Sequence, residues 1–396
     1  MVFQVTFVIP KILQKSRGKY NLRIVFWLIN LLHPQPAGVL ECGMRNRLLA
    51  GLWALALLLT ACQNGDRAGA PEGLRPPAGA SSTPGSSPGA EASPSFSSAV
   101  SVLDSAEYAI VEHFLITNHG PGSPSKHNLW AALIQTLPPY QQVLEMSIST
   151  PDYQTFEDEN GNLIAEFDLS GLSPGESLQL DIRYKVKVNR LAYDLAKCQA
   201  DLPTTFTSPE LYIESNNPQI RSLSAELSQG QSSPCEQVRA FYDYAGDHLV
   251  YTFNGRDWGA QAALGEMGAD CSEYASLVIA LTRAAGIPAR YLEGVLYLDP
   301  ATEALARREH AWLEVYLPNT GWTPVDPTLG RSLSLREAHF ASYHPDHIIV
   351  TRGRNPSALR GASYYTHIYW PGPSAEIKIE EFGWQITPIP GEEPGF

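Results

Sequence analysis

The chain from residue 177 to residue 188 alternates strictly between apolar and polar side chains. A period of two with one polar face indicates an antiparallel strand that is buried on one side. Residues 108–117 and 129–137 are predicted as further strands, and the Asn-Gly pair at 160–161 is a hairpin signal. Several short strands at this spacing predict a small β-sandwich domain over residues 100–190.

The pattern changes to a helical period after Pro209. The sequence SPCE at 233–236 combines a capping box with proline at the first helical position, so a helix is predicted there. A second helix is predicted to begin at Cys271 and to end before Gly286. Helices followed by an antiparallel sheet make an α+β fold, which we assign to residues 205–396 together with C-terminal strands. The strands of that sheet are predicted at 290–298, 311–317 and 322–326.

The N-terminal part has the layout of a targeting signal. Two arginines precede a short apolar run at 48–59, and small residues then lead to Cys62. The run is too short to span a membrane, so residues 44–61 are predicted to be a signal peptide. The sequence LTAC at 59–62 resembles the lipobox of bacterial lipoproteins, which implies lipidation at Cys62. We therefore expect a membrane-anchored protein of the bacterial cell envelope that faces outside the cytoplasm.

The segments on either side of this signal are not expected to belong to the fold. Residues 1–43 lie upstream of a complete signal, which indicates either a start codon assigned too early or a genuine extension. Residues 62–99 consist largely of Gly, Ala, Ser and Pro and have little apolar material to bury. They are predicted to be a disordered tether.

The chain is acidic, with a formal net charge of −13. Residues 1–61 hold seven lysines and arginines and one glutamate, so the chain without them would carry −19 instead of −13. Nucleic-acid binding needs a basic face, so we expect no nucleic-acid partner.

Five cysteines are present, and export would place them in an oxidising compartment. Cys198 and Cys235 are a possible disulfide pair there, which would leave Cys271 free. The sequence alone does not show whether the two are close enough to pair.

Cys271 stands where a helix is predicted to begin, which is an unusual place for a buried apolar residue. The dipole and the free N–H groups of a helix N-terminus lower a thiol pKa and can hold an oxyanion. A nucleophilic thiol also needs a base, usually a histidine that a third group orients. His310 opens one predicted strand and Asp326 closes the next, in the order of a Cys-His-Asp triad.

The segments GADCSEYA, GIPARY, HAWLEVYLP and GWTPVDPT resemble the core motifs of the transglutaminase-like superfamily, over roughly residues 230–330. The resemblance implies a papain-like fold, in which the helix that carries the cysteine packs on an antiparallel sheet. It implies Cys271 as the nucleophile, His310 as the general base and Asp326 as the orienting acid. Glu273 stands where the family more usually has aspartate, which is a mild departure outside the triad.

The resemblance also implies a thioester intermediate formed from a protein or peptide substrate. The enzyme would then be a cysteine protease, a deamidase or a cross-linking transglutaminase, and the sequence leaves these three open. A different class remains as the alternative, namely a non-catalytic binding module of the cell envelope that uses the β-sandwich domain. The presence of all three triad residues favours the enzyme.

Other polar residues near the triad have weaker signals. Gln261 and Trp258 precede the cysteine by ten and thirteen residues, and either side chain is able to donate to an oxyanion. Three histidines at 339, 344 and 347 fit no standard zinc spacing, so we expect a surface cluster, no metal and no cofactor.

The predicted strand pairing raises one difficulty. A four-residue loop at 318–321 would set Asp326 opposite Leu313, an odd number of positions from His310 and therefore on the other face of the sheet. A bulge near Pro324 would restore a common face, so irregular pairing is predicted there.

Overall fold

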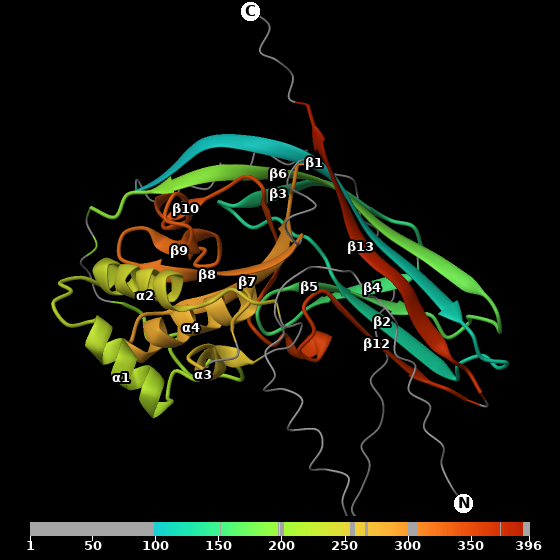
Figure 1. Cartoon of the computed structure of the whole chain (residues 1–396). Helices are drawn as coiled ribbons and strands as arrows, with labels where there is room; N and C mark the ends of the chain where they lie inside the picture. Colours follow the sequence, from blue (N-terminus) through green and yellow to red (C-terminus); the bar gives the residue numbers. More distant parts are fainter. Residues whose placement is uncertain are drawn as a thin grey trace, which may run out of the picture. The chain divides into compact units, whose positions relative to one another are not determined.

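The structure is a computed structural model, drawn in Figure 1. The residues that it describes are 99–390, apart from 151, 197, 199–201, 254–257, 266–267, 300–307 and 373. They belong to one compact unit. The predictions for the signal peptide, the lipidated Cys62 and the tether up to residue 98 lie outside the described residues. Within the described part of the chain, no helix combines the length and the apolar character needed to cross a membrane.

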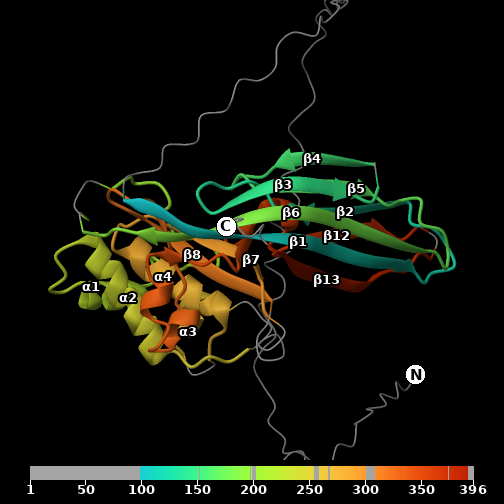
Figure 2. The ribbon, with the colours of Figure 1, turned by 90° about the horizontal axis from the view of Figure 1, so that it is seen from above.

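Two antiparallel sheets lie one over the other in Figure 1 and overlap in the view from above in Figure 2. The first consists, in spatial order, of β10 (Ser342–Tyr343), β6 (Ser177–Tyr193), β1 (Val100–Asn118) and β13 (Ile377–Ile389), with β3 (Gln141–Ile148) also paired to β6. The second consists of β12 (Tyr365–Trp370), β2 (Lys126–Ala132), β5 (Leu163–Asp168) and β4 (Tyr153–Glu157). Fully buried Phe114, Leu129 and Phe167 belong to the core that these sheets share. The antiparallel sheets that the alternating segments predict are therefore present.

The C-terminal strands belong to these two sheets. β13 pairs with β1 along most of its length, and β12 pairs with β2. From the sequence we assigned these strands to the domain at 205–396, and this assignment was wrong. Local patterns do not reveal which distant strands pair with each other. Ile377 and Trp384 of β13 are buried in the core of the two sheets, which explains where the strand docks.

A third antiparallel sheet carries the helices. Its strands, in spatial order, are β11 (His347–Arg352), β7 (Ala289–Leu296), β8 (Glu309–Leu317) and β9 (Gly321–Val325). The helices are α1 (Pro218–Leu227), α2 (Pro234–His248), α3 (Gly259–Ala263) and α4 (Cys271–Ala284), with short 3-10 turns η1 (Leu329–Arg331), η2 (Glu337–His339) and η3 (Ser357–Leu359). The mixed α/β architecture agrees with the predicted α+β fold class.

The two faces of the third sheet bury different partners. Tyr291 and Leu313 share a core with α2 and α4, whereas Leu292 and Trp312 belong to the core of the two stacked sheets. This alternation follows from the period of two in a strand, and it explains why β7 and β8 are apolar at nearly every position. The sheet therefore joins the helices to the stacked sheets.

The disulfide that the sequence left open is formed, between Cys198 and Cys235. It ties the segment after β6 to the first turn of α2. The Ser233 side chain accepts a hydrogen bond from the Glu236 backbone N–H at 3.3 Å, as a helix cap should. The Glu236 carboxylate accepts from the backbone N–H of Ser232, so only half of the predicted capping box is present.

Candidate active site

Cys271 occupies the first turn of α4 and is partly exposed. The Asp270 side chain caps the helix by accepting from the Ser272 backbone N–H at 3.1 Å. The Glu273 carboxylate accepts from the Asp270 backbone N–H at 3.1 Å, which completes a capping box. The helix begins at the predicted residue and ends before Gly286, which has a positive φ of 79°. Of the described cysteines, Cys271 alone lies outside a disulfide.

Glu273 is fully buried and connects the helix to the segment before it. Its Oε1 accepts from the Trp258 backbone N–H at 3.1 Å. Burial, with the charge of Asp270, raises the pKa of Glu273 to about 7. From the sequence, Glu273 was interpreted as a mild departure from the family pattern. The structure shows that its carboxylate also holds the backbone of Trp258 beside the head of α4.

The two oxyanion candidates lie in different settings. Trp258 directly precedes α3 and is tied to α4 through its backbone. The Gln261 residue is exposed on α3, and its backbone N–H donates to Glu214 at 3.1 Å. Their assignment as oxyanion donors stays a prediction.

His310 and Asp326 form a buried pair, with Nε2 of the ring 2.7 Å from Oδ2 of the carboxylate. Burial by itself lowers the pKa of His310, but the charge of Asp326, its hydrogen bond and a hydrogen bond with Cys271 outweigh it. The pKa of His310 is therefore raised to about 9. Burial would raise the pKa of Asp326, but the two imidazoles of His310 and His347 hold it well below its usual value.

Asp326 is fixed by hydrogen bonds on both carboxylate oxygens. Oδ1 accepts from the backbone N–H groups of Thr328 and Leu329, both at 3.0 Å. Oδ2 lies 2.7 Å from His310 and 3.3 Å from Nε2 of His347. An acid held in this way keeps one orientation, and so it can orient the imidazole that it contacts.

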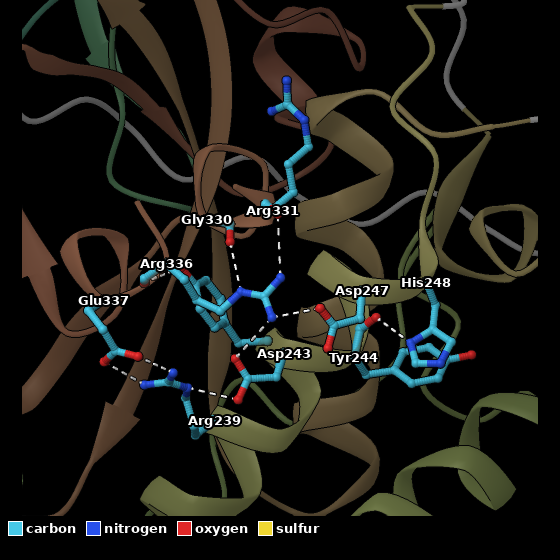
Figure 3. A network of polar contacts seen from close by, with 10 residues as sticks. Arg239, Asp243, Tyr244, Asp247, His248, Gly330, Arg331, Arg336 and Glu337 are labelled. Atoms are coloured by element: carbon cyan, nitrogen blue, oxygen red, sulfur yellow. Dashed lines mark hydrogen bonds and ion pairs between the residues drawn. The ribbon is translucent and has the colours of Figure 1, made fainter. Parts of the chain in front are cut away.

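The segment that follows Asp326 is clamped to α2 by arginines, as Figure 3 shows. Arg336 is buried and donates to Asp247 at 2.7 Å, and its Nε donates to a backbone carbonyl oxygen in η1 at 3.0 Å. Arg239 of α2 donates to Asp243 at 2.9 Å and also pairs with Glu337. Sequence reasoning did not identify this network, because no motif marks it.

The pairing of β8 and β9 corrects the predicted bulge. Leu313 pairs with Val325 and Leu317 pairs with Gly321, with no shift of register between them. The connecting loop is therefore one residue shorter than predicted, which places Asp326 one step beyond Val325 and opposite Trp312. His310 and Asp326 then share a face without any irregularity. The positive φ of 72° at Gly321 explains how this glycine closes the turn.

Two of the three histidines in the expected surface cluster are buried, and His344 is half-buried. His339 and His347 are 7% and 3% exposed, and the rings at 339 and 344 lie 4.7 Å apart. Burial lowers the pKa of His339 to about 4, so this ring is neutral near pH 7. The prediction was wrong because β11 returns beside β7 and brings His347 next to Asp326, a contact that local spacing does not reveal.

A metal ion is a poor fit to these residues. In the described chain, ligand-type atoms of His310, Asp326 and His347 lie within 4.8 Å of one another. These same atoms already form hydrogen bonds with each other at 2.7 and 3.3 Å. An ion would have to replace both bonds, so we describe the group as a hydrogen-bonded network.

The loop that leads to His310 lies mostly outside the described residues, at 300–307.

Part of the chain is similar to known proteins. Residues 221–327 match the family model for the transglutaminase-like superfamily, so the chain contains a transglutaminase-like domain there. A protein-glutamine gamma-glutamyltransferase of Pseudomonas aeruginosa is 30% identical over 176 residues, which are 42% of this chain and 25% of that protein. The uncharacterized protein YebA of Bacillus subtilis is 26% identical over 224 residues, 52% of this chain and 29% of that protein. The chain thus spans less than a third of either relative.

A solved structure shares the fold over most of the chain. The crystal structure of a proposed cysteine protease from Cytophaga hutchinsonii superposes with a TM-score of 0.56 and 16% identity, covering 75% of this chain and 95% of that one. At this identity the likeness concerns the fold alone. Residues 221–327 are thus transglutaminase-like, and the fold of the chain resembles that of the C. hutchinsonii protein. Members of the transglutaminase-like superfamily are generally cysteine-dependent enzymes.

Proposed function

We propose that the chain is an exported, lipid-anchored thiol enzyme that attacks peptide or glutamine-type amide bonds through a thioester on Cys271. The observation that carries the proposal is the buried His310–Asp326 pair beside a free cysteine in the first turn of α4. The raised pKa of His310, at about 9, keeps its imidazole protonated near pH 7, and a cationic neighbour is one of the settings in which a cysteine becomes reactive.

Each residue of the triad has one role in the proposed reaction. The Cys271 thiolate attacks the amide carbonyl carbon, and the backbone N–H of Cys271 at the head of α4 stabilises the oxyanion that forms. His310 gives its proton to the leaving amine as the C–N bond breaks, which leaves the thioester and a neutral imidazole. Since Nε2 of His310 bonds to Asp326, Nδ1 is the nitrogen assigned to this transfer.

The second half of the reaction regenerates the enzyme. Water or an amine attacks the thioester, and neutral His310 accepts the proton of the nucleophile. The C–S bond then breaks, and the thiolate and the imidazolium are restored. Water gives hydrolysis or deamidation, whereas an amine gives cross-linking. The name of the P. aeruginosa relative supports glutamine side chains as one substrate class. Peptides are the class that the resemblance to the superfamily implies.

One experiment separates the three reactions. The purified protein is incubated with casein and a fluorescent primary amine, and the products are resolved by gel and by peptide mass spectrometry. Amine incorporation indicates cross-linking, a mass gain of one unit at glutamine indicates deamidation, and new peptide ends indicate proteolysis. Cys271→Ala should abolish whichever product forms. If Cys271 is alkylated no faster in the folded protein than in the unfolded protein, that result would favour the non-catalytic binding module instead.

The lipid anchor is tested separately from the chemistry. Cells expressing the wild-type protein are grown with a labelled fatty acid, and Cys62→Ser is the matched variant. We expect label in the wild type and none in the variant, with the variant released from the membrane fraction. A wild-type protein without label would contradict the anchor and leave the thiol chemistry unaffected.

A further inference from the structure

Asp326 contacts a second imidazole, that of His347, besides the imidazole of His310. Nε2 of His347 lies 3.3 Å from Oδ2 of Asp326, the same oxygen that contacts His310. Nδ1 of His347 lies 2.7 Å from Oδ1 of Asp346. The ring is 3% exposed, and it bridges the buried carboxylate of Asp326 and the partly exposed carboxylate of Asp346. A ring that donates from both nitrogens is an imidazolium.

The surroundings of His347 favour this charge. Burial alone would lower the pKa of His347, but the charge of Asp346 and the hydrogen bonds to both carboxylates raise it to about 9. The His310 ring lies 5.9 Å away between centroids, and the neutral His339 ring lies 6.1 Å away. The remaining neighbours are His344 at 6.3 Å, Trp312 at 5.1 Å and Tyr343, whose hydroxyl donates to the carbonyl oxygen of His347 at 2.8 Å.

We propose that His347 is a positioning residue, whose buried positive charge on Asp326 sets the pH range in which the Cys271–His310 pair exists as thiolate and imidazolium. This inference rests on the proposed function of the triad. A fixed positive charge behind Asp326 offsets part of the negative charge that Asp326 presents to His310. The same charge favours loss of the thiol proton.

The sign of the effect follows from electrostatics. Loss of a proton from the thiol, and later from the imidazolium of His310, becomes harder when a nearby positive charge is removed. The pKa values of both Cys271 and His310 should therefore rise when His347 is replaced by an uncharged residue. At a ring separation near 6 Å inside a protein, the shift is on the order of one pH unit.

The test measures the thiol itself and needs no substrate. The rate of alkylation of Cys271 by iodoacetamide is followed from pH 4 to pH 10 in the full-length protein, with modification quantified on the Cys271 peptide by mass spectrometry. His347→Gln keeps a hydrogen-bond donor but removes the charge. We expect the midpoint of its pH profile to rise by roughly one unit. His248→Gln, an exposed histidine on α2, is the matched control and should behave as the wild type.

Asp346→Asn provides an independent route to the same result. Without its charge partner His347 should lose its proton at neutral pH, so the midpoint should rise in the same direction. The double variant should show no further rise, because both changes act through one charge. A His347→Gln profile that matches the wild type, even with a lower melting temperature, would reduce His347 to a packing role and overturn the inference. Failure of the wild type to act on amides would instead count against the proposed function.

Discussion

At the scale of single residues, Asp326 has more partners than an orienting acid needs. Its carboxylate accepts from two backbone N–H groups and contacts two imidazoles. A residue at the rim of a cleft can often be replaced with little loss of stability, but Asp326 is 4% exposed and does not occupy such a position.

Asp326→Asn should therefore lower both activity and stability. The new amide N–H₂ would face the imidazole that Asp326 now orients, so the ring would lose its tautomer and its charge partner. We expect turnover to fall by about 10³- to 10⁴-fold. The melting temperature should fall as well, whereas that of Cys271→Ala should not. Amide turnover and calorimetry on both variants check this, and full activity in Asp326→Asn would mean that the orienting acid is elsewhere.

At the scale of elements, the position of Asp326 depends on the segment from η1 to η2. The Arg336 guanidinium fastens this segment to α2 through Asp247, and it also binds the carbonyl oxygen of Gly330 within the segment. The backbone N–H groups that hold Asp326 lie at the start of the same segment. Replacing Arg336 should therefore affect the position of Asp326 indirectly, through this segment.

Arg336→Ala should destabilise the protein by about 2 kcal/mol, because it removes the donor to the buried carbonyl oxygen of Gly330 and the bond to the half-exposed Asp247. It should also slow turnover by changing kcat more than KM, since the substrate is not contacted. Arg221→Ala, an exposed arginine on α1, is the matched control and should change neither. Chemical denaturation and steady-state kinetics are the measurements. Normal kcat in a destabilised Arg336→Ala would show that the clamp serves stability alone.

The sequence predicts those elements whose signals are local. Asp270, Cys271 and Gly286 mark the ends of α4 within the helix and its flanks, and the structure has the helix there. The register of β8 and β9 was wrong by one residue, because a loop of three and a loop of four residues look alike in a sequence. That single residue decides which face Asp326 takes.

Contacts between distant segments were not predictable in this way. His347 reaches Asp326 only because β11 pairs with β7, and β13 reaches β1 only across nearly the whole described chain. Hydrophobic periodicity assigns a residue to a face but not to a partner strand. The three proposed triad residues could be identified as candidates because each sits in a motif, whereas the residues that contact them do not.

At the scale of the whole molecule, buried histidines should give stability a maximum near pH 6.5. His310 and His347 have folded pKa values of about 9, so their contribution is complete below pH 6.5 and is lost as the pH rises toward 9. His127 and His339 have folded pKa values of about 4. Their contribution to stability is therefore complete above pH 6.5 and is lost as the pH falls toward 4. Melting temperatures from pH 4 to pH 9.5 check this, and a monotonic curve would contradict it.

His347→Gln is an informative variant for this curve. It removes one of the two groups that destabilise the protein as the pH rises, so the alkaline decline should become shallower. The acid side should change less, because the charge of His347 is only a secondary cause of the lowered pKa of His339. His127→Gln should do the reverse and flatten the acid side. An identical pH dependence in all three proteins would mean that other groups control it.

The pairing of β13 with β1 has a consequence for how the protein reaches its folded form. Phe114 of β1 pairs with Phe382 of β13, so β1 has a neighbouring strand on both sides only after almost all of the chain has been synthesised. Such long-range pairing makes folding slow, and a slowly folding chain remains unfolded, and therefore able to cross a translocation channel, for longer. That delay suits the translocation that we propose. It also means that a chain cut short before Ile377 would expose an open strand edge on β1, where other copies could add and aggregate.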